Sequence, residues 1–467
     1  MTYQTINPAN GKVVKTYEDI SDAALNEVMD VAQACYENDW RRRSVAQRAG
    51  IVHAAATCMR QQSDHLAGLV TLEMGKLIAE AKGEVALSAD ILDYYAERAE
   101  AFLKPQLIPD APSATIETFP LGIILGVEPW NFPYYQLARV VGPQLMVGNV
   151  LVLKHAANVP QSALAFARIF EEVGAPKGAY TNIFASTDQV GRLIEDPRVR
   201  GVTVTGSERA GAAVAERAGR ALKKSVMELG GSDPLIVLQD ADLEHALAGA
   251  LFGRMFNTGQ SCVSSKRIIV VGQQRGETFL REFSAVLGTL QAGDPADPET
   301  TLGPLSSERA LDLLLDQIRI AKDGGARVVL GGNRIDRPGY YLEPTILTGI
   351  DAKNPASVLE FFGPVASFYY VDTEDEAIEL ANATPFGLGA SVFTSAVGRA
   401  RQVARQIESG MVFINQPAWT APELPFGGIK NSGFGRELSE LGFGEFVNRK
   451  LVNVAPAGSP PWGPVPV

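Results

Sequence analysis

Residues 122–154 read GIILGVEPWNFPYYQLARVVGPQLMVGNVLVLK. The stretch begins with an apolar run, Ile123–Val127, has a helical pattern from about Tyr134, and ends in a second apolar run, Val150–Lys154. Short apolar runs on either side of a helix are typical of buried parallel strands joined by a crossover. The stretch therefore predicts one strand–helix–strand unit of an open α/β sheet.

The same alternation continues on the C-terminal side of this unit. A helical pattern begins near Gln161, and strands are predicted at Asn182–Phe184 and Val202–Thr205. Strands and helices taking turns are the pattern of a parallel, doubly wound sheet of Rossmann-like type. A second alternating run, Lys266–Asn415, predicts another α/β domain, and we expect the active site to lie between the two domains.

The segments before the first sheet have a different character. Ser21 can cap a helix that runs to about residue 39, with apolar side chains at helical spacing on one face. Residues 104–117 are extended and contain three prolines, which predicts an exposed, hairpin-like arm.

The totals limit the classes of protein and partner. At 467 residues the chain should divide into two or three domains. A net charge of −11 disfavours nucleic acid and anionic lipid, and we expect neither partner.

The N-terminus lacks a targeting pattern and no apolar run is long enough for a membrane span, which favours a cytoplasmic location. Cys35, Cys58 and Cys262 form no disulfide framework or zinc-like cluster, so we expect a reducing compartment and no metal site.

Two glycine-containing segments carry groups suited to nucleophilic chemistry. Residues 227–234, MELGGSDP, place Glu228 at the end of an apolar strand, and residues 257–262, NTGQSC, end in Cys262. A thiol is well suited to attack an aldehyde, and a carboxylate can activate the water that later releases the product. An inert buried cysteine is the common alternative. No histidine lies near Cys262 in the sequence, so a Cys–His protease dyad has little support.

Together with residues 128–133, EPWNFP, and residues 425–433, PFGGIKNSG, these segments resemble the aldehyde dehydrogenase superfamily over nearly the whole chain. The four motifs occur in family order. Residues 202–207, 222–224 and 435–439 are most similar to the bacterial succinate-semialdehyde dehydrogenase branch.

The resemblance implies the aldehyde dehydrogenase fold, with a Rossmann-like cofactor domain, an α/β catalytic domain and a small β arm. The expected ranges are 1–103 and 122–228 for the NAD(P)-binding domain, 229–437 for the catalytic domain, 104–121 and 438–456 for the oligomerisation element, and 457–467 for an extended tail. In the family the arm is exchanged between subunits, so a homodimer or a homotetramer is expected.

By the same resemblance, Cys262 is the nucleophile and Glu228 is the general base that directs water at the thioester. Asn131 would donate its side-chain amide, with the backbone N–H of Cys262, to the oxyanion formed when the thiol adds to the carbonyl. The alternatives are a surface carboxylate in a turn at 228 and an asparagine in a proline-rich turn at 131. The accompanying motifs favour the catalytic interpretation.

Cofactor residues are expected in both alternating runs. Thr205, Gly206, Ser207 and Gly211 lie where a strand ends and a helix opens, so backbone N–H groups there can face a pyrophosphate. The resemblance adds Lys154 at the adenosine ribose, Glu360 at the nicotinamide ribose and Phe362 beside the ring, and it assigns Trp130 and Leu229 to the same site.

Ala157 bears on the choice of cofactor. Many NAD-preferring members have a glutamate at this position for the ribose hydroxyls. Without that carboxylate a 2′-phosphate is not repelled, so we expect NADP to be accepted, with NAD also possible.

A substrate with a distal carboxylate needs a cation in the tunnel, and Arg139 on the helix after the oxyanion turn is the candidate. A solvated or interface arginine is the alternative. Tyr135, Phe256 and Trp419 are candidate tunnel residues, with simple packing as their alternative role.

We expect oxidation of succinate semialdehyde to succinate. The competing functions are a broad-specificity aldehyde dehydrogenase for aliphatic or aromatic aldehydes, an acyl-transfer enzyme using coenzyme A, and a catalytically inactive binding protein.

Overall fold

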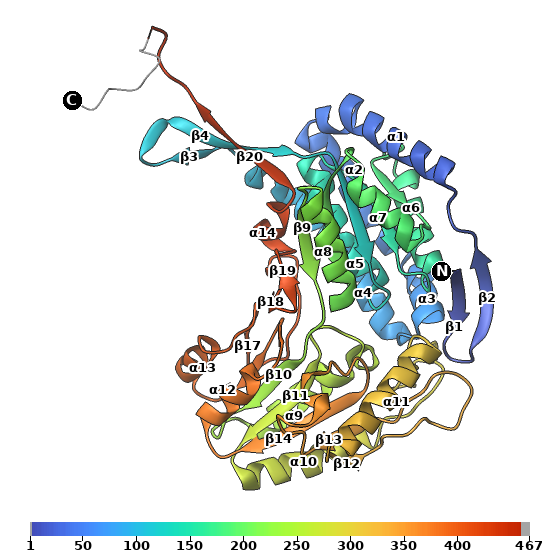
Figure 1. Ribbon diagram of the computed structural model, residues 1–467, viewed down its shortest axis with the longest axis vertical. Helices are drawn as coiled ribbons and strands as arrows, with labels where there is room; N and C mark the ends of the chain where they lie inside the picture. The colour runs from blue at the N-terminus through green and yellow to red at the C-terminus, as the bar shows by residue number, and fades with distance from the viewer. Residues whose placement is uncertain (1, 459–467) are drawn as a thin grey trace.

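The computed structural model describes residues 2–458 as two α/β bodies and a thin β arm (Figure 1). The predicted α/β class is confirmed. The predicted tail, residues 457–467, lies outside the described residues except for its first two positions. Among the described helices, none has both the length and the hydropathy that a membrane span requires.

The residues before the first large sheet form a short hairpin and a group of helices. Their bounds are β1 (Tyr3–Asn7), β2 (Lys12–Tyr17), α1 (Asp22–Asn38), η1 (Trp40–Arg42), α2 (Val45–Gln61), α3 (Ser63–Met74) and α4 (Ile78–Phe102). Ser21 caps α1 as predicted, by accepting a hydrogen bond from the Ala24 N–H. Ser44 and Gln47 form a capping box at the start of α2.

The first large sheet has six strands in the order β19-β9-β8-β5-β6-β7, all parallel except β19. Its strands are β5 (Ile123–Glu128), β6 (Val150–His155), β7 (Tyr180–Asn182), β8 (Val199–Thr205), β9 (Lys224–Glu228) and β19 (Gly433–Phe434). The connecting helices are α5 (Pro133–Val147), α6 (Pro160–Glu172), α7 (Thr187–Glu195) and α8 (Glu208–Arg220). The unit predicted from residues 122–154 is confirmed, because β5 and β6 are parallel neighbours joined by α5.

One strand of this sheet differs from the prediction. We expected a strand at 182–184, but β7 ends at Asn182. The chain leaves the sheet soon afterwards because Ser186 caps α7, with Gln189 completing a capping box.

The second large sheet has seven strands in the order β12-β13-β14-β11-β10-β16-β17, all parallel except β12. Its strands are β10 (Asp233–Val237), β11 (Ser265–Val271), β12 (Arg327–Leu330), β13 (Thr345–Thr348), β14 (Val365–Val371), β16 (Ser391–Phe393) and β17 (Phe413–Ile414). Its helical segments are α9 (Leu243–Met255), η2 (Phe256–Gly259), α10 (Gln273–Leu287), α11 (Glu308–Asp323), η3 (Pro355–Val358), α12 (Glu374–Asn382) and α13 (Val397–Ala404). The second alternating run is therefore confirmed.

The chain crosses between the two sheets twice. It first leaves β9 at Glu228 and enters β10 at Asp233, next to the domain boundary expected at 229. It returns through a short ladder of β15 (Phe386–Gly387) with β18 (Ile429–Lys430), and β19 then pairs with β9, placing Gly433 opposite Glu228. The end of the predicted catalytic range thus lies in the first sheet, beside the strand that carries Glu228.

The arm is a three-stranded antiparallel sheet in the order β20-β4-β3, from β3 (Gln106–Ile108), β4 (Ala111–Pro120) and β20 (Val447–Asn453). Figure 1 shows it as a narrow ribbon extending away from the body. A short helix, α14 (Ser439–Phe443), precedes β20. The hairpin and the C-terminal strand were both predicted, while the use of the arm in oligomerisation stays a prediction.

Candidate active site

Cys262 follows a strained turn between α9 and β11. Asn257, Thr258 and Gly259 all have positive φ, at 56°, 54° and 72°. Consecutive non-glycine residues in the left-handed region are uncommon and persist only where surrounding contacts fix them. Here Glu80 of α4 accepts a hydrogen bond from the Asn257 N–H at 3.1 Å. Contacts from another element therefore fix the backbone that leads to the thiol.

Gly259 is required by both conformation and space. A Cβ at this position would collide with the Gly363 carbonyl oxygen and with the Arg254 guanidinium. Arg254 is fully buried and donates to the carbonyl oxygens of Gly259, at 2.7 Å, and Gly363. The guanidinium thus joins the cysteine turn to the loop that contains Glu360.

Asn131 lies against the same turn. It is buried between β5 and α5, and its side-chain amide donates to the Gln260 carbonyl at 3.2 Å. In return, its own carbonyl accepts a hydrogen bond from the Asn257 side chain at 2.9 Å. An amide donor held beside the peptide segment of Cys262 can stabilise an oxyanion formed at the thiol.

Cys262 lines a cavity of about 650 Å³ with mostly apolar walls. Its aromatic lining residues are Phe132, Tyr135, Phe252, Phe256, Trp419 and Phe426. The Phe256 ring centroid lies 5.1 Å from that of Phe252 and 5.3 Å from that of Trp419. Tyr135, Phe256 and Trp419 therefore lie where the sequence predicted tunnel residues. Such a surface suits the hydrocarbon part of a small substrate.

Arg139 was expected in this cavity, but it is not among the described lining residues. Its guanidinium is fully buried and lies 4.7 Å from the ring centroid of Tyr135 and 4.6 Å from that of Phe426. Its Nε forms an ion pair with Glu437 at 2.8 Å. Arg139 thus lies one layer behind the cavity wall, which corrects the expected position. The physical reason is that a buried guanidinium needs a counter-ion, and Glu437 supplies it.

The terminal nitrogens of Arg139 differ in how many hydrogen bonds they donate. Nη2 donates to the Gln136 side chain and to the Thr205 hydroxyl, the latter at 3.2 Å. Within the described chain, Nη1 donates only to the Tyr135 hydroxyl, at a long 3.4 Å. The least engaged edge of the guanidinium is therefore the one next to a cavity-lining side chain.

Glu228 is buried at the end of β9, and both carboxylate oxygens lack a hydrogen-bond partner within residues 2–458. Burial, reinforced by Glu437 and opposed by Arg139, raises the pKa of Glu228 well above its usual range. A Cβ at Gly427 would lie 2.7 Å from one of these oxygens. Glu228 is also not among the described residues that line the cavity. In this conformation the environment of Glu228 favours its protonated form, and its role as a general base stays a prediction.

Glu228 belongs to a group that we call the acidic cluster: Glu128, Glu228, Glu437 and Arg139. Burial and the neighbouring Glu437 raise the pKa of Glu128 well above its usual range, and both of its oxygens lack a partner in the described chain. Burial also raises the pKa of Glu437, while Arg139 lowers it. Three carboxyl groups thus lie around Arg139, and burial favours the protonated form of each of them.

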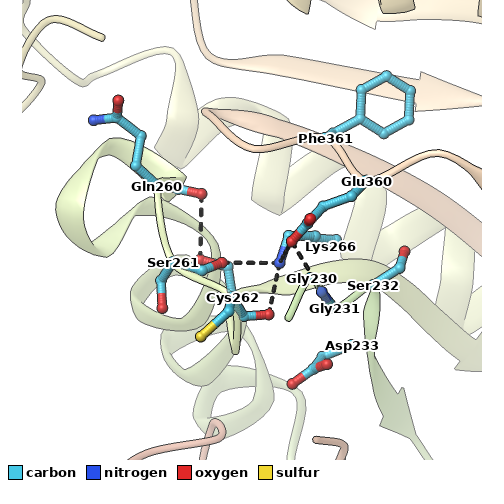
Figure 2. Close-up of polar contacts among 12 residues, drawn as sticks. Gly230, Gly231, Ser232, Asp233, Gln260, Ser261, Cys262, Lys266, Glu360 and Phe361 are labelled. Carbon is cyan, nitrogen blue, oxygen red and sulfur yellow. Dashed lines mark hydrogen bonds and ion pairs between the residues drawn. The ribbon is translucent and has the colours of Figure 1, made fainter. Parts of the chain in front are cut away.

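The second sheet and the segments beside it contribute a group that we call the basic cluster: Lys266, Arg254 and Arg267 with Glu360 and Asp233. The Lys266 ammonium donates to the carbonyl oxygens of Ser261 and Cys262, each at 2.8 Å. It also forms an ion pair with Glu360 at 3.1 Å, and Figure 2 shows the ammonium among these three acceptors. Arg267 donates to the Ser232 carbonyl at 2.8 Å.

The chain matches the aldehyde dehydrogenase family over residues 1–452. It belongs to this family. A succinate-semialdehyde dehydrogenase (NADP+) from Deinococcus radiodurans is 49% identical, over 98% of this chain and 96% of the relative. A probable enzyme of the same name from Synechocystis is 44% identical, over 97% of this chain and 100% of the relative. The crystal structure of succinic semialdehyde dehydrogenase from Streptococcus pyogenes in complex with NADP+ has a TM-score of 0.95 at 47% identity, covering 97% of this chain and 99% of that one. The resemblance predicted from the motifs is confirmed.

Aldehyde dehydrogenases need a dinucleotide site, and the expected residues of this chain lie at the carboxyl ends of parallel strands. Ser207 caps α8, and a Cβ at Gly206 would meet no atom closer than 3.9 Å, so the start of α8 is open to a ligand. Gly211 is needed for packing, since a Cβ there would lie 2.6 Å from the Leu229 side chain. Thr205 ends β8 directly opposite Glu228. These features fit a pyrophosphate at the helix N-terminus.

The two ends of the expected dinucleotide site are also formed. Lys154 lies at the end of β6 with its ammonium 5.6 Å from the Tyr3 ring, and burial lowers its pKa. The carbonyl of Ala157 accepts from the Gln4 N–H at 2.9 Å, so the N-terminal hairpin borders this end. At the other end the rings of Trp130 and Phe362 meet edge to face at 5.7 Å. The roles of these residues in cofactor binding stay predictions.

Sequence reasoning missed Lys266, Arg254, Glu80 and Glu437. For Lys266 a signal existed, because two consecutive basic residues interrupt the apolar strand β11, and a buried charge is costly unless it is paired. Glu437 offered no such signal, since its partner Arg139 is distant in the sequence. The aldehyde dehydrogenase motifs point to candidate reacting groups but not to the charges around them.

Proposed function

We propose that this aldehyde dehydrogenase oxidises succinate semialdehyde to succinate with reduction of NADP+. The observation that carries the proposal is that Cys262 lines an aromatic cavity, with the Asn131 amide against its turn and Glu228 buried at the end of β9. The names of the two relatives and of the Streptococcus pyogenes structure support the choice of substrate and cofactor.

The first half of the reaction forms a thioester. The Cys262 thiolate adds to the aldehyde carbon, and the carbonyl oxygen becomes an oxyanion that accepts hydrogen bonds from the Asn131 amide and the Cys262 N–H. The oxyanion then collapses as hydride leaves the carbon. NADP+, when bound, supplies the acceptor for that hydride. The protein's part is to hold the thiol, the oxyanion and the aldehyde in one geometry.

The second half hydrolyses the thioester. Glu228 takes a proton from a water whose oxygen attacks the thioester carbon, the C–S bond breaks, and succinate leaves with the thiolate restored. Because the pKa of Glu228 is raised in the resting conformation, the base must first lose its proton. We therefore expect hydrolysis to accelerate as the pH rises through that pKa.

The substrate's distal carboxylate requires positive charge, and no lysine or arginine is among the described residues lining the cavity. Arg139, behind the wall at Tyr135 and Phe426, is our candidate. Its Nη1 is directed at the Tyr135 hydroxyl, which itself lies 2.7 Å from the Thr420 hydroxyl. We assign recognition of the carboxylate to Arg139, Tyr135 and Thr420. The Tyr135 hydroxyl would contact the carboxylate and is itself hydrogen-bonded to Arg139.

For the cofactor, Lys154 supports an anionic partner. Its ammonium lies beside the Tyr3 ring, the charge of Asp19 acts on it, and position 157 carries an alanine in place of a carboxylate. A 2′-phosphate would therefore be attracted by Lys154 and would meet no carboxylate at position 157. NADP+ is the proposed cofactor, with NAD+ as a weaker alternative.

We further propose that the arm mediates a homodimer or homotetramer. Leu107, Leu451 and Val454 are exposed apolar side chains on or next to its strands, which supports burial against a second copy. The enzyme also needs Cys262 reduced, and the cytoplasm meets that requirement.

The test follows formation of reduced cofactor with succinate semialdehyde and with pentanal, each with NADP+ and with NAD+. We expect kcat/KM to favour the charged aldehyde, and Arg139→Met to lower that preference, the ratio of the two kcat/KM values, at least 10-fold. Arg168→Met, an exposed arginine on α6, is the matched control. Equal kcat/KM for both aldehydes would instead support a broad-specificity aldehyde dehydrogenase, which the apolar cavity lining also suits. An inactive wild-type enzyme, or an active Cys262→Ala variant, would overturn the scheme.

A further inference from the structure

Lys266 is fully buried in β11, four residues after Cys262, and its ammonium has three acceptors. These are the carbonyl oxygens of Ser261 and Cys262 and the carboxylate of Glu360 (Figure 2). An ammonium has three N–H donors, so these partners use all of them. The side chain therefore links the backbone of the nucleophile directly to the carboxylate expected at the nicotinamide ribose.

A mechanical link between these loops already exists without Lys266. Arg254 bridges the Gly259 and Gly363 carbonyl oxygens, as described above. What Lys266 adds is a full positive charge next to the peptide of Cys262. Burying an ammonium is costly unless its charge is paired, and its ion-pair partner in the described chain is Glu360.

Glu360 is engaged on the inner side of its loop in this structure. Its carboxylate accepts the Gly231 N–H at 3.0 Å as well as the Lys266 ammonium at 3.1 Å. A Cβ at Gly230 would collide with this carboxylate, so the chain leaves space for the inward position. A carboxylate that also binds ribose hydroxyls must give up part of its pairing with Lys266.

The charges around the thiol make the pKa of Cys262 sensitive to the pairing between Lys266 and Glu360. Burial raises the pKa of Cys262 to about 12, Arg139 and Lys266 lower it, and Glu360 and Asp233 raise it. Tyr135 lines the same cavity as Cys262, and burial raises its pKa to about 12. Of these groups, Lys266 and Glu360 form an ion pair, and Glu360 is also the residue expected to bind the nicotinamide ribose hydroxyls.

We propose that Lys266 is a positioning residue that makes ionisation of the Cys262 thiol depend on where the Glu360 carboxylate is held. This inference rests on the proposed role of Cys262 as nucleophile. With Glu360 turned inward, its negative charge offsets the ammonium. With Glu360 drawn toward the nicotinamide ribose, the ammonium acts on the thiolate alone. Occupation of the ribose site thereby increases the reactivity of the thiol before any aldehyde is bound.

The test is the rate of alkylation of Cys262 by iodoacetamide as a function of pH, with and without NADP+ and without any aldehyde. Mass spectrometry of the Cys262 peptide separates it from Cys35 and Cys58. In the wild-type enzyme we expect NADP+ to accelerate alkylation at pH 7. In Lys266→Met the midpoint should rise by about one pH unit, alkylation at pH 7 should slow about 10-fold, and NADP+ should no longer stimulate it. Lys266→Arg should restore much of the wild-type profile.

Glu360→Gln gives the opposite sign and guards against misfolding of the lysine variant. Without the carboxylate the ammonium is not offset, so we expect the cofactor-free enzyme to alkylate about 10-fold faster at pH 7. Lys322→Met, an exposed lysine on α11, is the control and should match the wild type. Unchanged profiles in Lys266→Met and Glu360→Gln, or shifts in the same direction, would overturn the proposal. Alkylation needs no turnover, so its result stands apart from the aldehyde test of the proposed function.

Discussion

The acidic and basic clusters, one from each α/β body, have opposite charge balances. The acidic cluster has three carboxyl groups and Arg139, and its carboxyl pKa values are raised. The basic cluster has three cations and two carboxyl groups, and burial lowers the pKa of Arg254 to about 9 and of Arg267 to about 10. The environment of the first cluster therefore favours protonated carboxyl groups, whereas in the second the cations outnumber the carboxyl groups beside the thiol loop.

This difference matches the two halves of the proposed reaction. Formation of the thioester needs a thiolate and an oxyanion, both negative, and positive charge from the second sheet favours them. Hydrolysis needs a base that can take up a proton and pass it on, and a group of carboxyls that share protons suits that step. Each of the two sheets thus contributes the electrostatics of one half-reaction.

Removing the base should have the largest effect. Glu228→Gln keeps the size of the side chain but cannot accept the proton of water, so we expect steady-state turnover to fall by about 100- to 10,000-fold. Thioester formation depends on the other side of the site, so a first burst of reduced cofactor should persist. Rapid-mixing absorbance at 340 nm measures both phases.

Glu216→Gln, an exposed glutamate on α8, is the control for that variant and should leave both phases unchanged. Loss of the burst together with turnover in Glu228→Gln would contradict the division of labour between the clusters. It would mean that Glu228 is also needed to ionise the thiol.

The next effect concerns stability. Arg139→Met removes the one cation of the acidic cluster, and breaking a buried ion pair in this way costs about 3–5 kcal/mol. The loss should be smaller at pH 6 than at pH 8, because the three carboxyl groups can then hold their protons. Urea unfolding midpoints at the two pH values measure this, with Arg168→Met as the exposed control. If the loss of stability were the same at both pH values, removal of Arg139 would not change the protonation of the carboxyl groups in this range.

The sequence predicted the helices and strands better than the charge clusters. Local apolar runs predict β5, α5 and β6, and the motifs indicate Cys262 and Glu228 as candidate reacting groups. The partners of Arg139 could not be predicted, because Glu437 reaches it only through the return of the chain in β19. Local patterns report local structure, whereas ion pairs between distant segments depend on the final packing.

The smallest effect tests a member of the basic cluster that carries no charge at low pH. Asp233 is buried, and its Oδ2 has no hydrogen-bond partner within residues 2–458. Burial, opposed by Lys266, raises the pKa of Asp233 from 3.8 to about 7. The folded state therefore keeps this proton while the unfolded state loses it, so its contribution to stability is present below about pH 4 and is lost as the pH rises toward 7. Asp233→Asn mimics the protonated group, and its urea midpoint relative to wild type should rise between pH 5 and pH 8. Asp110→Asn, exposed between β3 and β4, should show no such trend. If the difference for Asp233→Asn were constant with pH, Asp233 would already be ionised in the folded protein. The basic cluster would then have less net positive charge, and the two clusters would differ less in charge than we propose.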